Sequence, residues 1–178
     1  MNWHEYHRLD IIHDFLDDLD SDYPSICTVG IIGTSLEGRQ LKVLKISNSD
    51  ASNQAVWMDA GIHAREWIAP AVATYIANHI ARNFSILPTS VTNKDCYGWG
   101  GKESSNNPGN AFYRGPEPFS EPESRAIRDF ILNSGIPFKA YITLHSYGQV
   151  ILFPFACRDE PCPDYVRLLE GATVMSKA

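Results

Sequence analysis

The order of strand-like and helix-like segments from residue 55 onward restricts the fold more than any other feature of the sequence. An apolar run at 55–59 precedes residues with helical spacing over 66–84, and a second helical segment at 120–133 precedes another apolar run at 138–144. Strands that alternate with helices favour a parallel sheet covered by helices. We therefore predict an α/β fold with a mixed, largely parallel sheet flanked by helices.

The segments before and after this alternation add further elements. Apolar residues at helical spacing between Trp3 and Leu19 predict an amphipathic helix. Strand-like runs at 27–32 and 40–46 are joined by turn residues, which predicts a hairpin. A strand at 150–155 and a helix at 163–177 complete the prediction.

Composition places the chain among single-domain globular proteins. With 178 residues and 44% hydrophobic residues, residues 1–178 can form one domain with its own core. The net charge is −6 and no basic run occurs, so nucleic-acid binding is not expected. The apolar runs are too short to cross a bilayer, and the first residues contain neither a signal peptide nor a pro-segment. We expect a monomer that does not bind membranes.

The four cysteines leave two interpretations open. They are Cys27, Cys96, Cys157 and Cys162, which are too few for a disulfide scaffold in a domain of this size. Cys157 and Cys162 form either a local bridge in an oxidising compartment or two free thiols. Their spacing fits none of the common paired-cysteine zinc patterns.

Three side chains that suit a metal ion follow two of the predicted strands. His63 and Glu66 lie three residues apart after the strand at 55–59, and His145 comes directly after the strand at 138–144. Open α/β sheets bind ligands beyond the carboxyl ends of their strands. Two imidazoles and a carboxylate suit a single Zn²⁺ with an open fourth position. The alternative is a glutamate at a helix start and two unrelated histidines.

Two longer motifs resemble the zinc motifs of the pancreatic-type metallocarboxypeptidases, the carboxypeptidase A/B family. They are the stretches at 61–67 (Gly-Ile-His-Ala-Arg-Glu-Trp) and 142–149 (Ile-Thr-Leu-His-Ser-Tyr-Gly-Gln). The segments at 3–6, 35–39 and 119–123 also look like that family, in matching order. The resemblance implies an incomplete zinc carboxypeptidase catalytic domain, truncated and with an internal deletion. It also implies one Zn²⁺ held by His63, Glu66 and His145, the ligand set known from carboxypeptidase A.

The resemblance implies a function as well. Members of this family hydrolyse the C-terminal peptide bond of peptides and proteins, and they are extracellular. Arg65 matches a substrate-contacting arginine, Tyr147 matches a residue of the substrate groove, and Asn93 and Lys94 stand where an Asn-Arg pair grips the terminal carboxylate. A lysine there is a point charge instead of a bidentate fork.

Other features depart from the family pattern. The irregular stretch at 85–109 replaces a longer segment that carries an arginine for the oxyanion, and Val91 replaces a carboxylate that orients a zinc-binding histidine. The family's catalytic glutamate has no counterpart after His145. We therefore expect weak or no hydrolytic activity, with an inactive zinc- and peptide-binding relative as the alternative. The preference for aliphatic, aromatic or basic C-terminal residues is not encoded in these motifs.

Overall fold

The computed structural model describes residues 1–50, 52–83, 104–110, 113–154 and 160–177. Its elements are those of an α/β chain. In order, the elements are α1 (Leu9–Asp22), β1 (Cys27–Thr34), β2 (Gln40–Ile46), β3 (Ala55–Ala60), α2 (Ile68–Arg82), α3 (Pro122–Asn133), β4 (Phe138–Leu144) and α4 (Tyr165–Met175).

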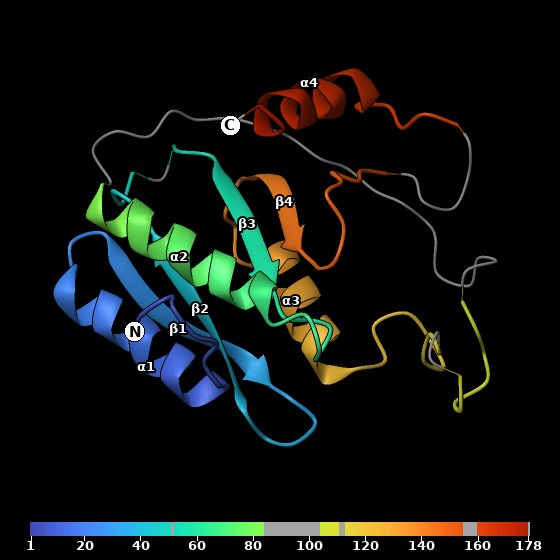
Figure 1. Ribbon diagram of the computed structural model, residues 1–178, viewed down its shortest axis with the longest axis horizontal. Helices are drawn as coiled ribbons and strands as arrows, with labels where there is room; N and C mark the ends of the chain where they lie inside the picture. The colour runs from blue at the N-terminus through green and yellow to red at the C-terminus, as the bar shows by residue number, and fades with distance from the viewer. Residues whose placement is uncertain (51, 84–103, 111–112, 155–159, 178) are drawn as a thin grey trace.

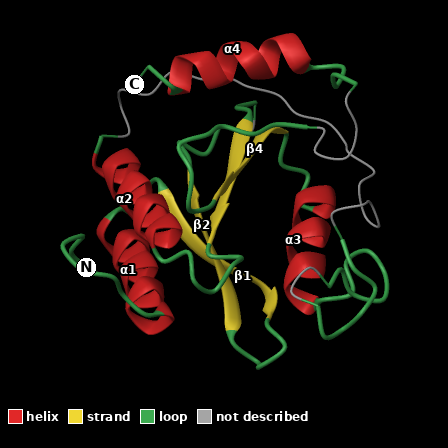
Figure 2. Ribbon diagram, turned by 45° about the vertical axis from the view of Figure 1, so that its right-hand side comes forward, coloured by secondary structure: helices red, strands yellow, loops and turns green. Residues whose placement is uncertain are grey.

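Three layers are visible in the structure. Helices α1 and α2 lie side by side on one face of the strands, and α3 lies on the other face (Figures 1 and 2). Helix α4 lies apart from this arrangement and contains no buried side chain (Figure 1). No helix in the described ranges is long and apolar enough to cross a membrane. The α/β prediction is thereby confirmed.

The strands pair in two ways. β1 and β2 form the predicted antiparallel hairpin, whose register shifts between Ile31 and Gly33. A Cβ atom added to Gly33 would lie 2.8 Å from the Cβ of Ala126, so a glycine allows α3 to pack closely on β1. β3 and β4 are parallel, with Asp59 opposite Thr143. The described residues also contain one isolated parallel bridge, between Ser105 and Tyr113.

The main buried cluster lies between α1, β1 and α2. Its members are Phe15, Leu19, Cys27 and Ala81, each 5% exposed or less. The Trp3 ring packs edge-on against Phe15, so the segment before α1 also contributes to the core. Such burial is the main source of stability for a domain this small.

A second group of aromatic rings connects β3 and β4 with α3. Trp57 is 7% exposed and contacts the rings of Phe130, Phe138 and Tyr141 at centroid distances of 5.7 to 6.5 Å. Because Trp57 lies two residues before Asp59, both side chains point to the same face of the strand. The aromatic group therefore lies next to Asp59, near the carboxyl end of β3.

Several predicted boundaries were wrong. α1 begins at Leu9 instead of near Trp3, and α2 begins at Ile68, so Glu66 lies in the preceding turn. The sequence from Ser120 to Glu123 also predicts a capping box at the start of α3, but it does not form, because the Ser120 hydroxyl donates to the neighbouring Glu121 carboxylate. Residues 150–154 form no strand.

Candidate metal centre

The turn between β3 and α2 carries the first two candidate ligands. The chain leaves β3 through Gly61, whose φ of +86° is a conformation that glycine adopts readily. The Glu66 backbone N–H then donates to the His63 carbonyl at 3.1 Å, which closes a tight turn. The Trp67 indole N–H donates to the Ala64 carbonyl at 2.9 Å and fixes the same turn. His63 and Glu66 therefore project from one compact loop.

The third candidate ligand arrives from a distant part of the chain. His145 directly follows Leu144, the last residue of β4, and Leu144 pairs with Ala60 at the end of β3. Because the two strands are parallel, both carboxyl ends meet at one edge of the sheet. The strand register thus brings together side chains separated by about 80 positions.

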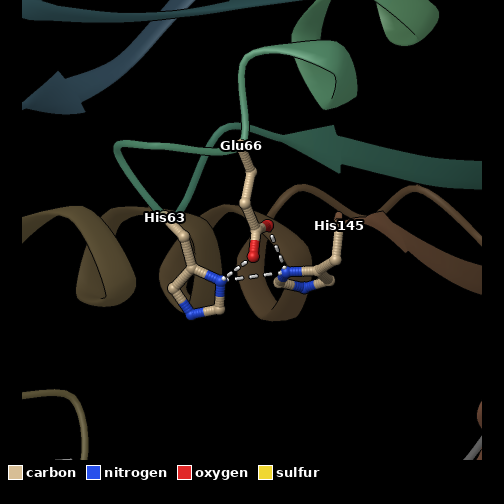
Figure 3. A group of neighbouring side chains, drawn as sticks. All are labelled: His63, Glu66 and His145. Carbon is tan, nitrogen blue, oxygen red and sulfur yellow. Dashed lines mark hydrogen bonds and ion pairs between the residues drawn. The ribbon is translucent and has the colours of Figure 1, made fainter. Parts of the chain in front are cut away.

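The three side chains converge on one point. The His63 Nδ1 lies 3.0 Å from one Glu66 carboxylate oxygen, and the His145 Nδ1 lies 3.0 Å from the other. The two Nδ1 atoms are 3.1 Å apart, the two rings are tilted by 49° to each other, and the Glu66 carboxylate reaches toward both Nδ1 atoms (Figure 3). All donor atoms lie within 4.8 Å of one another.

This arrangement fits a tetrahedral metal ion. Zinc binds imidazole nitrogen and carboxylate oxygen at about 2.0–2.1 Å, and a tetrahedral angle then places two donor atoms about 3.3 Å apart. The observed separations of 3.0 to 3.1 Å are close to this value. A shared cation would accept the lone pairs of both Nδ1 atoms and of the carboxylate at once, which suits this geometry.

Exposure differs among the three side chains. His63 is 60% exposed, His145 is 39% exposed and Glu66 is 13% exposed, so the carboxylate is the inner member. Burial raises the pKa of Glu66, but the hydrogen bond from the Ser146 backbone N–H and the polar contacts with both imidazoles, together with the charge of His63, outweigh it and lower the pKa. Glu66 is therefore anionic at neutral pH, as a metal ligand must be.

The remaining predicted site residues are only partly described. Arg65 lies in the same turn as His63 and Glu66, and its side chain is exposed. Tyr147 lies two residues after His145 and is fully exposed. Asn93 and Lys94 lie outside the described residues. Their roles in substrate binding stay predictions.

Two further sequence predictions also concern residues outside the described ranges. Val91 is one of them, so its replacement of an orienting carboxylate stays a prediction. Cys162 is buried, but Cys157 is not described, so their pairing also stays a prediction.

Sequence reasoning missed two residues beside the ligands. The Thr143 hydroxyl lies 3.1 Å from the His145 Nε2 and donates to Asp59 at 2.7 Å. Trp57 donates to the same carboxylate at 2.9 Å. The two-residue spacing from Thr143 to His145 was the available signal, since residues i and i+2 of a strand share a face.

The sequence matches a described protein family over almost its whole length. A model of the zinc carboxypeptidase family matches residues 12–96 and 92–178. Carboxypeptidase B of Astacus astacus is 34% identical to the chain, and the match covers 97% of the chain and 72% of the relative. That alignment extends over 219 residues, so the relative contains residues that this chain lacks.

Other relatives are longer. Carboxypeptidase A1 of Rattus norvegicus is 32% identical, and the match covers 94% of the chain and 51% of the relative. The chain spans about half the length of the mammalian carboxypeptidases it matches.

Solved carboxypeptidase structures share the fold. Bovine thrombin-activatable fibrinolysis inhibitor, solved with tick carboxypeptidase inhibitor, is 27% identical with a TM-score of 0.83, covering 96% of this chain and 71% of that one. Carboxypeptidase A from Helicoverpa armigera has a TM-score of 0.85 at 23% identity, covering 100% and 55%. With the family match and the geometry at the strand ends, these similarities establish that the chain belongs to the zinc carboxypeptidase family.

Proposed function

We propose that His63, Glu66 and His145 together hold one Zn²⁺ and that this site acts on the C-termini of peptides. The observation that carries the proposal is the convergence of two Nδ1 atoms and one carboxylate within 3.1 Å of one another. When bound, the ion supplies polarisation of a carbonyl oxygen and activation of a water. Membership of the zinc carboxypeptidase family supports this metal and this reaction class.

The substrate side of the site is assigned to exposed residues. Arg65 follows His63 by two positions, and its guanidinium group suits a peptide's terminal carboxylate, because the two groups form parallel hydrogen bonds. Tyr147 offers a fully exposed ring next to the metal centre in sequence. Asn93 and Lys94 complete the proposed carboxylate-binding set. We propose that the chain works as a single monomeric domain in an extracellular setting and binds neither nucleic acid nor membrane.

Turnover by these 178 residues is proposed to be weak or absent. Within the described part of the chain, Glu66 is the carboxylate of the donor set, and a metal ligand cannot also serve freely as a general base. The second candidate function is therefore a zinc-dependent peptide-binding protein without hydrolysis. Both candidates need the metal, and they differ in whether an amino acid is released.

One experiment tests the proposal in two steps. Zinc is first titrated into metal-free protein, and we expect one equivalent to bind. A peptide with a free C-terminus is then compared with the same peptide ending in an amide, by binding and by mass spectrometry of released amino acid. We expect zinc-dependent binding of the free peptide alone, with slow or no release.

The outcomes separate the candidates clearly. Failure to bind zinc would refute both. Equal binding of the amide would remove the C-terminal specificity, whereas rapid release would show that another group acts as base. Tick carboxypeptidase inhibitor, the partner of the bovine relative, serves as a second binding probe.

A further inference from the structure

A chain of hydrogen bonds leads from the proposed metal site into the sheet. The His145 Nε2 lies 3.1 Å from the Thr143 hydroxyl, which lies 2.7 Å from one oxygen of Asp59. The other Asp59 oxygen accepts the Trp57 indole N–H at 2.9 Å. The path thus connects an exposed imidazole to a buried tryptophan.

The direction of each hydrogen bond follows from the groups themselves. An ionised carboxylate only accepts hydrogen bonds, so the single hydroxyl proton of Thr143 must point to Asp59. The Thr143 oxygen then accepts, and the group on its other side must be a donor. That group is the His145 Nε2, which therefore carries a proton. In the neutral ring the Nδ1 lone pair is then available to a cation held between His145, His63 and Glu66.

We propose that Asp59, acting through the Thr143 hydroxyl, is a positioning residue that fixes the tautomer and ring orientation of His145 for metal binding. The inference rests on the proposed zinc site. A metal-binding histidine usually donates its other N–H to an oxygen acceptor, and loss of that acceptor lowers metal affinity by about 10–100-fold. Here the acceptor is the Thr143 hydroxyl, and Asp59 on its other side determines the direction of the hydrogen bond.

The strand register makes the path possible. Asp59 and Thr143 are directly opposite each other in the parallel pair. Because side chains alternate along a strand, Trp57 and Asp59 share one face of β3. Tyr141 and Thr143, their partners on β4, share one face of that strand, and His145 continues the same two-residue spacing after β4. Burial, followed by a hydrogen bond to Asp59 and the charge of Asp59, raises the pKa of Tyr141. The carboxylate therefore accepts hydrogen bonds from several donors, which hold its orientation.

The two histidines differ in this respect. Among the described residues, no protein group bonds to the Nε2 of His63, whereas the Nε2 of His145 is bound to Thr143. His145 is also the less exposed of the two. We expect the ring of His145 to be oriented before the metal arrives, so its positioning residues should matter for affinity.

Three substitutions test the path at two points. Thr143→Val removes the hydroxyl, Thr143→Ser keeps it, and Asp59→Asn replaces an acceptor by an amide that can donate. Zinc affinity is measured on the whole chain by competition with a chromophoric chelator. We expect about a 10–100-fold loss for Thr143→Val and Asp59→Asn and a change of less than about threefold for Thr143→Ser.

A second readout does not need the metal. Nitrogen-15 NMR of the histidine rings in metal-free protein reports which nitrogen of His145 is protonated. We expect the Nε2–H form in the wild type and in Thr143→Ser. Asp59→Asn should shift the population toward Nδ1–H, because its amide can donate to Thr143 and turn the hydroxyl proton toward the ring. Thr28→Val on β1 is the matched control for a threonine-to-valine change in a strand.

The outcomes distinguish this inference from the proposed function. If the wild type binds one zinc but Thr143→Val binds it equally well with the same tautomer, the positioning role is wrong and the zinc site stands. If the wild type binds no zinc while the tautomer still responds to Thr143→Val, the positioning role stands and the zinc site is wrong. The double variant Asp59→Asn/Thr143→Val should be no weaker than the weaker single variant, because both act on one path. Additive losses would overturn the serial path.

Discussion

The apolar cluster beneath α1 and the polar edge of β3 and β4 are built by opposite means. In the cluster, Phe15, Leu19 and Cys27 are nearly inaccessible to solvent and are held by packing. At the strand edge, His63 and His145 are exposed and are held by directed polar contacts. The comparison suggests that stability and metal binding in this chain can be changed separately.

Removal of the Phe15 side chain should have the largest effect on folding and little effect on the metal site. Its ring is 5% exposed and packs edge-on against Trp3. Phe15→Ala should lower the free energy of unfolding by about 3–5 kcal/mol, since it leaves a cavity in the core. Chemical denaturation measures the loss, and zinc affinity is measured on the folded fraction.

Leu132→Ala is the matched control, because this α3 side chain is 72% exposed. It should change the free energy of unfolding by less than about 0.5 kcal/mol. A large drop in zinc affinity for folded Phe15→Ala protein would show that the two regions are coupled, contrary to the comparison.

Loss of a proposed metal ligand should have the reverse pattern. Glu66→Ala and His145→Ala should each weaken zinc binding by more than about 100-fold, which exceeds the loss expected for a residue that only orients a ligand. Metal-free stability should change little for His145→Ala, because this side chain is 39% exposed, and more for Glu66→Ala, because the carboxylate is 13% exposed. Isothermal titration with zinc measures the first effect, and thermal melting with chelator measures the second.

His79→Ala provides the histidine control for this series. His79 is an exposed residue of α2 that takes no part in the donor group. Equal zinc loss in the control and in His145→Ala would mean that zinc binds elsewhere or nonspecifically.

A smaller effect is expected at the point where the two kinds of region meet. Trp57 is buried like a core residue, yet its indole N–H donates to Asp59. Trp57→Phe keeps most of the ring packing and removes the donor, so we expect a loss of about 1–2 kcal/mol in the free energy of unfolding. Zinc affinity should fall by less than about tenfold. A variant as weak as Asp59→Asn in zinc binding would place the anchor at Trp57 instead of Asp59.

The smallest expected effect is a pH dependence in the α1 region. Burial, followed by the charge of Lys42, lowers the pKa of His13, and the opposing carboxylates of Asp17 and Asp14 do not compensate. As the pH falls below about 6.5, the unfolded chain therefore takes up a proton before the folded one does. Stability should decline from there until the pH passes the folded pKa of His13.

Unfolding by urea at a series of pH values between 5 and 8 measures this decline. The variant His13→Gln cannot take up the proton, so its stability should vary less over the same range. A variant that kept the wild-type slope would assign the pH dependence to other groups.

The sequence predicted those parts of the structure that depend on periodic patterns. Strand-like apolar runs located β2 and β4, and helical spacing located α1, α2, α3 and α4, although α1 begins six residues later than expected. The predicted ends of these elements were less accurate, because they depend on local hydrogen bonds of polar side chains that periodicity does not reveal. Ser120, for example, bonds to Glu121 instead of capping α3.

The sequence predicted the candidate metal ligands but not the residues that hold them in position. His63, Glu66 and His145 belong to longer motifs, and a parallel sheet brings strand ends together. The path through Thr143 to Asp59 depends on one detail of register, that these two residues are directly opposite each other. A shift of one residue would turn the threonine to the other face. Sequence spacing alone does not fix that register.

X-ray absorption at the zinc edge of the purified, zinc-loaded chain tests the central claim most directly. We predict one ion with only nitrogen and oxygen ligands at about 2.0–2.1 Å, including the scattering pattern of two imidazoles. Zinc–sulfur scattering at about 2.3 Å would instead place the ion on a cysteine and contradict the assignment to the two histidines and the glutamate.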